Sequence, residues 1–592
     1  MKALNKKLFL YVFIFLLVCL AINVFFHPFK RSVTSLGPLD KKLIADYVYS
    51  VIDSYSQGNK TPDVAVRTNV NLDLDYEKVY ISLYNNNTLL GCQSGRVKKN
   101  VRERLFLDLK DASIRTLKDS RFVNIENKKI DKDTYVVVSL LFNKKKMAQN
   151  KLAYLNKKVE LGMHSILLTR SGKGACFISG APIIKNYNLE KTLKQLCKKG
   201  GFKENCFLDK HTQINRLDTV VFKAERNKEI TDLYRFNILV DQKEIKQKSI
   251  LESLTLAKDW ALNNINSKTN LLEYTYYPSR DAYASNNQHT RQLATLWALT
   301  ELREFLKTKE LDSLIQSTFN HYLANERTKD GYAYLAIDEN PSIAFNAFMI
   351  MSLLNSNVAQ KEALLDKLAK GILFTQLPDG SYRTNFNSDK IVGIDYSPGE
   401  AMLSLMKIYK ATKNSAYLDS VKKAFPYYRK YWRGKKNSAF IPWHTQAYYL
   451  LYQETADPEL AKFIFEMNDW LIDRSQIYSS AYLDKIGGFP KKIPGGTVTA
   501  VYLEGINDAY ALAVEKQDRR HKEKYGRSIA WGTRFILQSQ FNEKNSFYLE
   551  NPKRAIGGIR ITLMDNIQRV DSVQHSVMAL LKVYKNKIFI SK

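Results

Sequence analysis

Polar and titratable side chains gather at six places in the C-terminal half of the chain, each near the start of an apolar helical stretch. Carboxyl and imidazole groups can exchange protons with a substrate, while aromatic and cationic groups can bind sugar rings and acidic substituents. The candidates for acid–base catalysis are Glu504, His444, His575, Asp571, Asp395 and Glu400. The candidates for substrate binding are Arg569, Arg291, His289, Trp443, Tyr396, Tyr502 and Asp508. This mixture favours an enzyme that acts on carbohydrate.

Several of these candidates also fit a structural role. Residues 397–400 (Ser-Pro-Gly-Glu) have the pattern of a capping box, and Asp571 followed by Gln574 has the pattern of a helix N-cap. Glu504 and Asp508 share one face of an otherwise apolar helix, where burying two unpaired carboxylates would be costly. We therefore expect them to line a wet cavity or to meet arginine or histidine, and Glu504 is the strongest single acid–base candidate.

The residue types separate two kinds of reaction. A glycosidase needs two carboxylates across the scissile bond, for which the candidates are Asp395, Glu504 and Asp571. A lyase or epimerase of uronic acids needs a base and a cation that neutralises the substrate acid, for which the candidates are His444, His575, Tyr396, Arg569 and Arg291. The histidines and arginines favour an acidic sugar. A glycan- or peptide-binding scaffold without catalysis is the alternative.

No metal or cofactor is expected. The cysteines and histidines show no C-x-x-C or H-x-x-x-H spacing that would indicate a metal site. The chain also lacks the P-loop, G-x-G-x-x-G and G-x-S-x-G motifs. These absences argue against nucleotide-binding and α/β-hydrolase chemistry.

The elements that must position these residues belong to a large globular chain. It has 592 residues, of which 45% are hydrophobic and 25% are charged, and this excludes disordered and collagen-like classes. A chain of this length holds about two to four domains. The architecture is therefore expected to be multidomain.

Residues 249–592 show a helical repeat. Apolar residues recur at i, i+3, i+4 and i+7. Apolar helices are expected to begin near His289, Pro341, Pro398, Pro442, Tyr502 and Asp571, with more polar helices between them. Six helical hairpins in series predict an all-α (α/α)6 toroid, in which the N-terminal ends of the inner helices meet at one mouth. An open α-solenoid is the alternative.

Residues 376–382 (Gln-Leu-Pro-Asp-Gly-Ser-Tyr) resemble a turn found in toroids of the terpenoid-cyclase and prenyltransferase kind. The chemistry of those families is not implied, because the D-x-D-D motif is absent and no cysteine follows Cys206. What remains is a similarity of architecture to the six-hairpin toroids of glycosidases, polysaccharide lyases and sugar epimerases. That similarity implies carbohydrate chemistry by analogy only.

Residues 38–225 predict a separate α+β domain. Helical patterns cover 41–55, 101–117 and 189–200, and strand patterns cover 79–84, 135–142 and 216–224. Four short motifs occur among these elements. They are L-G-C-Q-S-G at 90–95, which follows a strand, D-S-R-F at 119–122, L-G-M-H-S-I at 161–166 and L-K-Q-L-C-K-K-G at 193–200. In order and spacing they resemble the AMMECR protein family, although the usual L-R-G-C-I-G is L-L-G-C-Q-S-G here. The resemblance implies an α+β fold and no agreed activity. A charged linker, residues 226–248, follows.

Cys92 is the one reactive-looking residue of this domain. A thiol beside glycines acts as a nucleophile only where a neighbour lowers its pKa, and no histidine is linked to it by a motif. A small, buried apolar role is therefore favoured. Cys197 and Cys206 could form a disulfide, as could Cys92 and Cys176, and the sequence does not choose between the connectivities.

Residues 1–31 predict a membrane anchor. Positions 8–26 are apolar except for Asn23, which is about the length that spans a bilayer, and three lysines precede them. A removable signal peptide is the alternative, although no A-x-A cleavage site follows. The expected location is the inner (cytoplasmic) membrane, with a single pass and most of the chain outside the cytoplasm. There the net charge of +31 favours an anionic polysaccharide over nucleic acid as partner, although a compositional bias explains this charge equally well.

Overall fold

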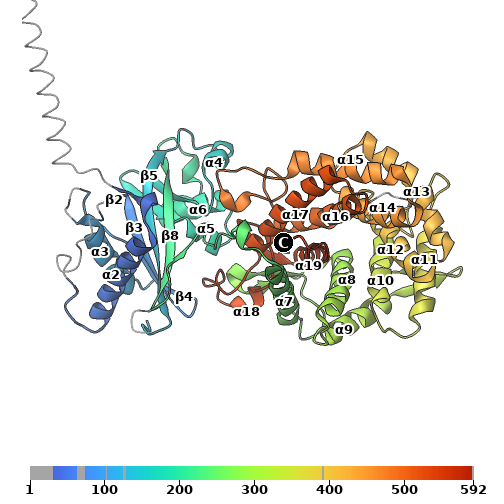
Figure 1. Cartoon of the computed structure of the whole chain (residues 1–592). Coiled ribbons are helices and arrows are strands. Elements are labelled where there is room, and N and C mark those ends of the chain that lie inside the picture. The colour runs from blue at the N-terminus through green and yellow to red at the C-terminus, as the bar shows by residue number, and fades with distance from the viewer. Residues whose placement is uncertain are drawn as a thin grey trace, which may run out of the picture. The chain divides into compact units, whose positions relative to one another are not determined.

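The computed structural model describes residues 31–62, 72, 74–99, 101, 103–124, 128–389 and 392–589, which form two compact units (Figure 1). The first unit contains the described residues up to Ala181 together with Leu189–Phe236. The second contains Pro182–Asn188 and the described residues from Asn237 onward. The apolar segment at 8–26 that predicts an anchor lies outside the described residues. Within the described part of the chain, no helix combines the length and the hydropathy needed to cross a bilayer.

The first unit is built on an antiparallel sheet. Its strands are β3 (Lys78–Asn85), β4 (Thr88–Ser94), β5 (Thr134–Lys146), β6 (His164–Arg170), β7 (Lys173–Phe177), β8 (Gln213–Glu225) and β9 (Thr231–Asp232). They pair in the order β4-β3-β5-β8-β6-β7, and β9 pairs with β8. A separate parallel pair joins β1 (Arg31–Ser32) and β2 (Leu74–Asp75). The helices of this part of the chain are α2 (Pro38–Ser56), α3 (Arg104–Leu117), α4 (Leu152–Lys158), α5 (Gly180–Ile184) and α6 (Leu189–Lys199).

The apolar periodicities of strand and helix explain the core of this unit. Val136 and Val138 alternate along β5, and Leu105, Leu109 and Ala112 recur at helical spacing on α3. These faces pack together with α2 in one apolar cluster. The predicted α+β fold is therefore confirmed. The L-G-C-Q-S-G motif follows the strand β3 as expected, and its residues 90–94 form most of the next strand, β4.

The second unit is a closed ring of helical hairpins (Figure 1). The inner helices are α8 (His289–Leu306), α10 (Ile343–Leu354), α12 (Ser397–Thr412), α14 (Ile441–Thr455), α16 (Gly496–Glu515) and α19 (Val570–Lys585). The outer helices are α7 (Gln247–Asn263), α9 (Asp312–Leu323), α11 (Lys361–Phe374), α13 (Ser415–Gly434), α15 (Pro458–Ser475) and α17 (Arg519–Ser539). Each inner helix packs on the next, and α19 packs on both α8 and α7, which closes the ring. The toroid prediction is confirmed and the open solenoid is wrong.

Closure follows from the composition of the inner helices. Along α10, every residue from Ile343 to Leu353 is buried, and a helix that is apolar on all sides must be enclosed by others. Five inner helices begin within two residues of the expected positions. The exception is α16, which begins at Gly496, six residues before Tyr502, so its polar residues lie deeper in the helix than expected.

Short strands and one short helix connect the helices of the ring. They are β10 (Thr275–Tyr277), β11 (Ala282–Tyr283), β12 (Glu326–Lys329), β13 (Tyr332–Leu335), α18 (Pro552–Ala555), β14 (Arg560–Thr562) and β15 (Asp565–Arg569). Strands β11, β10, β15 and β14 form one small sheet in that order. Because β15 ends at Arg569 and α19 begins at Val570, this sheet places Arg569 at the entrance of an inner helix.

Three joints between outer helices repeat one hydrogen-bonding arrangement. At each joint, a glutamine after one outer helix accepts from a serine hydroxyl of the next, and its amide donates to that serine's carbonyl and to the carbonyl of a glycine. The glutamine, serine and glycine sets are Gln376, Ser420 and Gly380; Gln476, Ser528 and Gly487; and Gln540, Ser253 and Gly557. All three glycines have a φ of +91° or +92°. A Cβ added at any of them would lie 2.3 Å or less from a carbonyl oxygen of the next outer helix. The turn at 376–382 is thus one copy of a structural joint.

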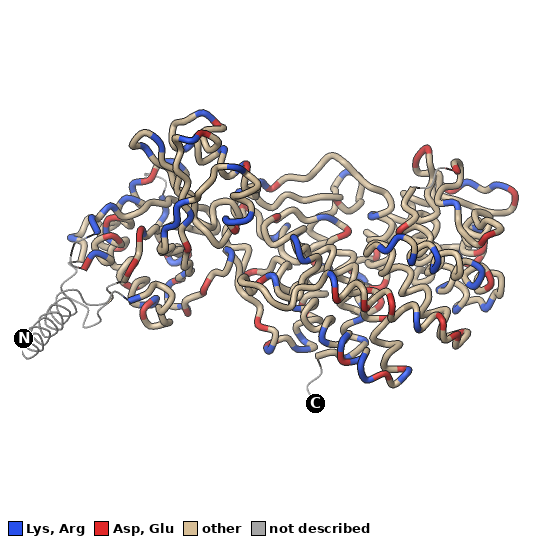
Figure 2. Tube along the Cα trace, turned by 90° about the horizontal axis from the view of Figure 1, so that it is seen from above, with Lys and Arg blue, Asp and Glu red and all other residues tan. Residues whose placement is uncertain are grey.

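The excess of basic residues is not gathered on one element. Figure 2 shows lysine and arginine interspersed with aspartate and glutamate along both units. Many of these charges form ion pairs at the surface, such as Arg433 with Glu466 and Arg429 with Glu459. Charge alone therefore does not locate a binding site.

Candidate functional site

The inner helices surround a central axis, and the residues that face it can be traced from a cavity on that axis. Leu403 of α12, Asp508 of α16 and Met578 of α19 line this cavity. Residues three or four positions earlier lie on the same helix face. Glu400, Glu504, Gln574 and His575 therefore face the axis, one turn closer to the N-terminal ends of their helices.

Glu504 and His575 form a direct pair across two neighbouring helices. Glu504 is fully buried, and its Oε1 lies 2.6 Å from Nδ1 of His575, which is partly exposed. The amide of Gln446 is 3.5 Å from the other carboxylate oxygen. Because the carboxylate engages Nδ1, the Nε2 nitrogen of His575 is the one left to exchange a proton. The expected meeting of Glu504 with an arginine or a histidine is thus observed.

Two further polar groups on the axis are buried without a partner. The Oε2 atom of Glu400 has no hydrogen-bond partner among the described residues, and burial raises the pKa of this carboxyl to about 8. Both amide atoms of Gln574 also lack a partner in the described part of the chain. The predicted capping roles of residues 397–400 and of Asp571 are wrong, since the N-cap positions are Tyr396 in α12 and Arg569 in α19, and neither helix has a side-chain cap. Buried polar groups without partners are costly, which makes this part of the axis a candidate site for polar ligand groups.

A cationic cluster lies one helical turn before His575. Asp571 accepts from Nε and Nη2 of Arg569, each at 2.6 Å, and lies 3.1 Å from Nε of Arg291. Arg291 also donates to the hydroxyl of Tyr274. One carboxylate shared by two guanidinium groups leaves one positive charge in excess. Such a cluster suits a carboxylate or another acidic substituent.

Aromatic rings fill the space beside this cluster. Trp443 is almost fully buried against Trp297 and Phe348, and its ring centroid lies 6.0 Å from that of His575. Its neighbour His444 is completely enclosed, and burial lowers the pKa of its imidazole to about 3. His444 is therefore neutral near pH 7.

Gly399 allows α12 and α14 to approach at this point. A Cβ at Gly399 would lie 2.7 Å from Cβ of Trp443 and 2.8 Å from Nδ1 of His444. The His444 ring also stacks on Phe440 with 3.3 Å between centroids, and its Nδ1 is 2.8 Å from the Phe440 carbonyl oxygen. The geometry gives His444 the contacts of a packed core residue, and its Nε2 atom is buried without a hydrogen-bond partner among the described residues.

His289 and Asp395 are occupied by local contacts. His289 begins α8 and places Nδ1 3.3 Å from the hydroxyl of Tyr322, while burial lowers the pKa of its imidazole. Asp395 accepts from the hydroxyl of Tyr431 at 2.9 Å and from the amide of Asn437 at 3.0 Å. In the described part of the chain, neither side chain bonds to Glu504 or His575.

The remaining candidates lie at different depths. Tyr396 is 49% exposed before α12, and Tyr502 is buried with its hydroxyl donating to Ser438. Asp508 pairs with Lys582 at 2.8 Å and lines the cavity at the C-terminal ends of the inner helices. Its place differs from the expected entrance because α16 begins six residues earlier than predicted.

Gln574 and Gln446 are axis residues that the sequence reasoning did not place in the site. A usable signal was present, since Gln574 precedes Met578 by one turn in the apolar stripe of its helix. A polar residue on a stripe that must be buried indicates either a paired group or a functional one.

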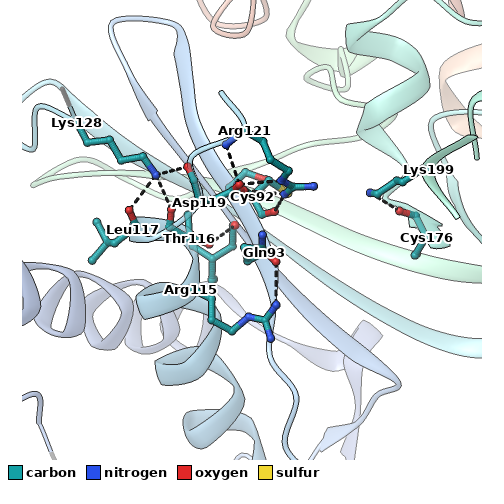
Figure 3. A network of polar contacts seen from close by, with 12 residues as sticks. Cys92, Gln93, Arg115, Thr116, Leu117, Asp119, Arg121, Lys128, Cys176 and Lys199 are labelled. Atoms are coloured by element: carbon teal, nitrogen blue, oxygen red, sulfur yellow. Dashed lines mark hydrogen bonds and ion pairs between the residues drawn. The ribbon is translucent and has the colours of Figure 1, made fainter. Parts of the chain in front are cut away.

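The first unit holds a separate network around Cys92 (Figure 3). The backbone N–H of Cys92 donates to Asp119 at 3.0 Å, and Arg121 bonds both oxygens of Asp119 and the Cys92 carbonyl. Gly91 permits this approach, because a Cβ there would lie 2.3 Å from the carbonyl oxygen of Thr116. The network joins the motif in β4 to the D-S-R-F motif after α3.

The Cys92 thiol has the environment of a neutral group. Burial raises its pKa, and the hydroxyl of Ser82 lies 3.2 Å from its sulfur. Lys199, whose own pKa burial lowers, donates to the carbonyl of Cys176 (Figure 3). Cys92 and Cys176 are free thiols, whereas Cys197 and Cys206 form a disulfide. The favoured apolar role of Cys92 agrees with this chemistry.

Comparison with known proteins identifies the first unit. Residues 45–222 match the AMMECR1 family model, so the N-terminal unit is an AMMECR1 domain. Protein NEQ441 from Nanoarchaeum equitans (strain Kin4-M) is 25% identical over 114 residues, which are 19% of this chain. The match spans 63% of that relative's length.

The helical toroid is similar to solved carbohydrate-active enzymes. A family 76 glycoside hydrolase from a bovine Bacteroides thetaiotaomicron strain shares 9% identity with a TM-score of 0.44, covering 76% of this chain and 96% of that one. A D-mannose isomerase shares 12% identity with a TM-score of 0.42, covering 57% of this chain and 97% of that one. At these identities the likeness is one of helical architecture.

Proposed function

We propose that the toroid is an enzyme that transfers a proton on an acidic sugar of a polysaccharide. The observation that carries the proposal is the buried, unpaired carboxyl of Glu400, which faces the same axis as the Glu504–His575 pair. An unpaired buried carboxyl with a raised pKa is suited to act as a general acid.

Each group in the cluster has a defined role in this proposal. His575 removes the proton next to the sugar carboxylate through Nε2, while Glu504 holds the imidazole through Nδ1 and stabilises its charged form. Glu400 is protonated near pH 7 and supplies a proton to the departing oxygen or to the opposite face of the sugar. Arg569 and Arg291 bind the sugar carboxylate, and Gln574 bonds the hydroxyl groups.

Hydrolysis fits the arrangement less well. A glycosidase needs a carboxylate that is free to attack or to activate water. Glu504 is held by His575, and Asp571 is held by two arginines. Proton abstraction needs no free carboxylate at these positions, because Glu504 and Asp571 keep their partners throughout the reaction.

The test is turnover of a panel of neutral and acidic envelope polysaccharides by the full-length protein in phospholipid discs. Reducing ends, ultraviolet absorbance of unsaturated uronates and deuterium incorporation from solvent are followed together. We expect absorbance or deuterium with acidic polymers only. Reducing ends alone would overturn the proposal in favour of hydrolysis, and binding without turnover would indicate a glycan-binding scaffold.

Substitutions connect the turnover to the cluster. We expect His575→Gln and Glu400→Gln each to lower turnover by about 10²–10⁴-fold. The matched controls are His321→Gln and Glu252→Gln, because both residues are exposed on outer helices. Equal activity of His575→Gln and His321→Gln would remove His575 from the mechanism.

The proposal also places the chain in the cell envelope, anchored by residues 1–31 in the inner membrane. The apolar run at 8–26 and the lysines before it support this location. The protein should stay in the membrane pellet after alkaline carbonate extraction, and deletion of residues 2–31 should release it. Extraction of the intact protein by carbonate would contradict the anchor.

A further inference from the structure

A second candidate site lies at the end of the toroid where the inner helices terminate. A cavity of about 560 Å³ is lined by residues of all six inner helices, most of them in the C-terminal halves. Its size is within the range of pockets that bind small organic ligands. Asp508 and Lys582 belong to this cavity; Asp508 lies one helical turn beyond Glu504, and Lys582 lies two turns beyond His575.

Two lysine–carboxylate pairs lie among the residues that line the cavity. Lys407 lies 3.2 Å from Glu301 and 5.2 Å from the ring centroid of Trp297. Lys582 lies 2.8 Å from Asp508 and also donates to the amide oxygen of Gln446. These two lysines are therefore neutralised by carboxylates within the cavity.

Two further lysines are in excess. Lys410 of α12 donates to the neutral amide of Gln453, and Lys585 of α19 has no carboxylate within ion-pair distance among the described residues. Lys585 nevertheless acts on the cavity. Although burial opposes the change, Lys407 and Lys585 lower the pKa of Glu301. Because α12 and α19 are three positions apart in a ring of six, the two lysines come from opposite sides of the cavity.

The helix macrodipole explains part of this pattern only. Lysine in a last helical turn is favourable, and both Lys410 and Lys585 occupy such turns. The dipole does not require that these lysines border a cavity with apolar walls. Those walls are formed by Met351, Leu403, Leu450, Met578 and Leu581.

We propose that this cavity binds a small organic anion, with an apolar body against these walls and a carboxylate or phosphate attracted by the excess positive charge of Lys410 and Lys585. The site is distinct from the sugar site and does not depend on the proposed enzymatic activity. An apolar ligand without the acid leaves the two cations unpaired, and an acid without the apolar body leaves the walls exposed. Both parts of the ligand are therefore needed for affinity.

Equilibrium dialysis with the full-length protein in discs of zwitterionic phospholipid tests the proposal, with binding to empty discs subtracted. The probes are 2-naphthoate and 2-naphthyl phosphate, which distinguish the two acids, together with the neutral 2-naphthylmethanol and acetate. We expect at least one naphthyl anion to bind about tenfold or more tightly than the alcohol or acetate. Equal binding of anion and alcohol would overturn the proposal.

Variants locate the binding. The double change Lys410→Gln and Lys585→Gln should weaken anion binding about tenfold or more, and Ala411→Trp should block it by filling the opening. The matched control is Lys367→Gln with Lys430→Gln, because these lysines are exposed on outer helices. Both Lys410 and Lys585 are exposed, so the first variant retains the fold. Unchanged binding in that variant would show that the anion sits elsewhere.

Discussion

Nδ1 of His575 lies 2.6 Å from Oε1 of Glu504, although the two residues are 71 positions apart in the chain. They meet because α16 and α19 are neighbours in the closed ring. His575 gives a hydrogen-bond partner to the carboxylate of Glu504, which is otherwise fully enclosed. The pair also orients an imidazole whose second nitrogen is left for proton exchange.

The first prediction concerns the charge of Glu504. Glu504→Gln keeps the shape of the side chain but cannot stabilise an imidazolium, so turnover should fall about 10²-fold with little change in KM. Steady-state kinetics with the polysaccharide found active in the panel checks this. Glu515→Gln, on the exposed end of the same helix, should behave as the wild-type protein. A change confined to KM would argue for a binding role of Glu504.

The second prediction concerns the buried carboxyl of Glu400. Its pKa is near 4.5 in the unfolded chain and is raised to about 8 in the fold. Between these values the folded state holds one proton more than the unfolded state, so stability is lost as pH rises. Relative to Glu400→Gln, the wild-type free energy of unfolding should fall by about 1.4 kcal/mol per pH unit between about pH 5 and pH 8.

Urea unfolding read by tryptophan fluorescence measures this slope for the toroid. All six tryptophans lie in the second unit, so the signal reports that unit alone. Glu252→Gln, at an exposed position of α7, should differ from wild type by a constant amount. Parallel curves for wild type and Glu400→Gln would show that the carboxyl is solvated.

The third prediction concerns the selectivity of the cationic cluster. Arg569→Gln leaves Arg291 paired with Asp571 and removes the excess positive charge. The dissociation constant of an acidic oligosaccharide should rise about tenfold, while that of its neutral counterpart should not change. Calorimetric titration at two salt concentrations checks this, with the exposed Arg327→Gln as control. Equal losses for acidic and neutral sugars would indicate a structural role for Arg569.

The fourth prediction concerns the repeated joint between outer helices. Gly380→Ala places a Cβ 2.3 Å from the carbonyl oxygen of Lys423 at a φ of +92°, so it should destabilise the toroid by about 2–4 kcal/mol. Gly434→Ala, whose added Cβ would meet no side chain or other element within 4 Å, should be neutral or slightly stabilising. Tryptophan-monitored urea unfolding compares the two. Similar stabilities would mean that the joint can relax.

The fifth prediction concerns Asp119 in the AMMECR1 domain. Burial opposes the change, yet the bonds from Arg121 and the Cys92 backbone lower the pKa of Asp119 to about 2. The carboxylate therefore contributes stability above about pH 4 that is lost as pH falls toward 2. Asp119→Asn should cost this unit about 2 kcal/mol at neutral pH, and the difference should vanish near pH 2.

Because the first unit has no tryptophan, hydrogen–deuterium exchange of β4 and α3 peptides is the appropriate measurement. Asp75→Asn, at an exposed position of β2, is the matched control. A difference between wild type and Asp119→Asn that persists at pH 2 would place its origin in packing and not in charge.

Local patterns in the sequence predicted most of the elements. Apolar spacing placed five of the six inner helices within two residues, and strand periodicity placed β3, β5 and β8. The start of α16 was missed because Gly495 and Gly496, which open it, read as loop residues. Glu504 was identified as a candidate because it lies on an otherwise apolar helix face, and His575 because it lies at the entrance of an inner helix, one turn after Asp571.

The sequence by itself determined the helices, the strands and the two-part organisation, because these depend on periodicities within short segments. Tertiary structure alone decided that Glu504 meets His575, that Asp571 is shared by two arginines, and that Cys197 bonds Cys206. It also decided that Asp508 faces the far cavity while Glu400 remains unpaired on the axis. These relationships join residues on different elements. They arise when the ring closes and the sheet assembles, and no local pattern encodes the distances that result.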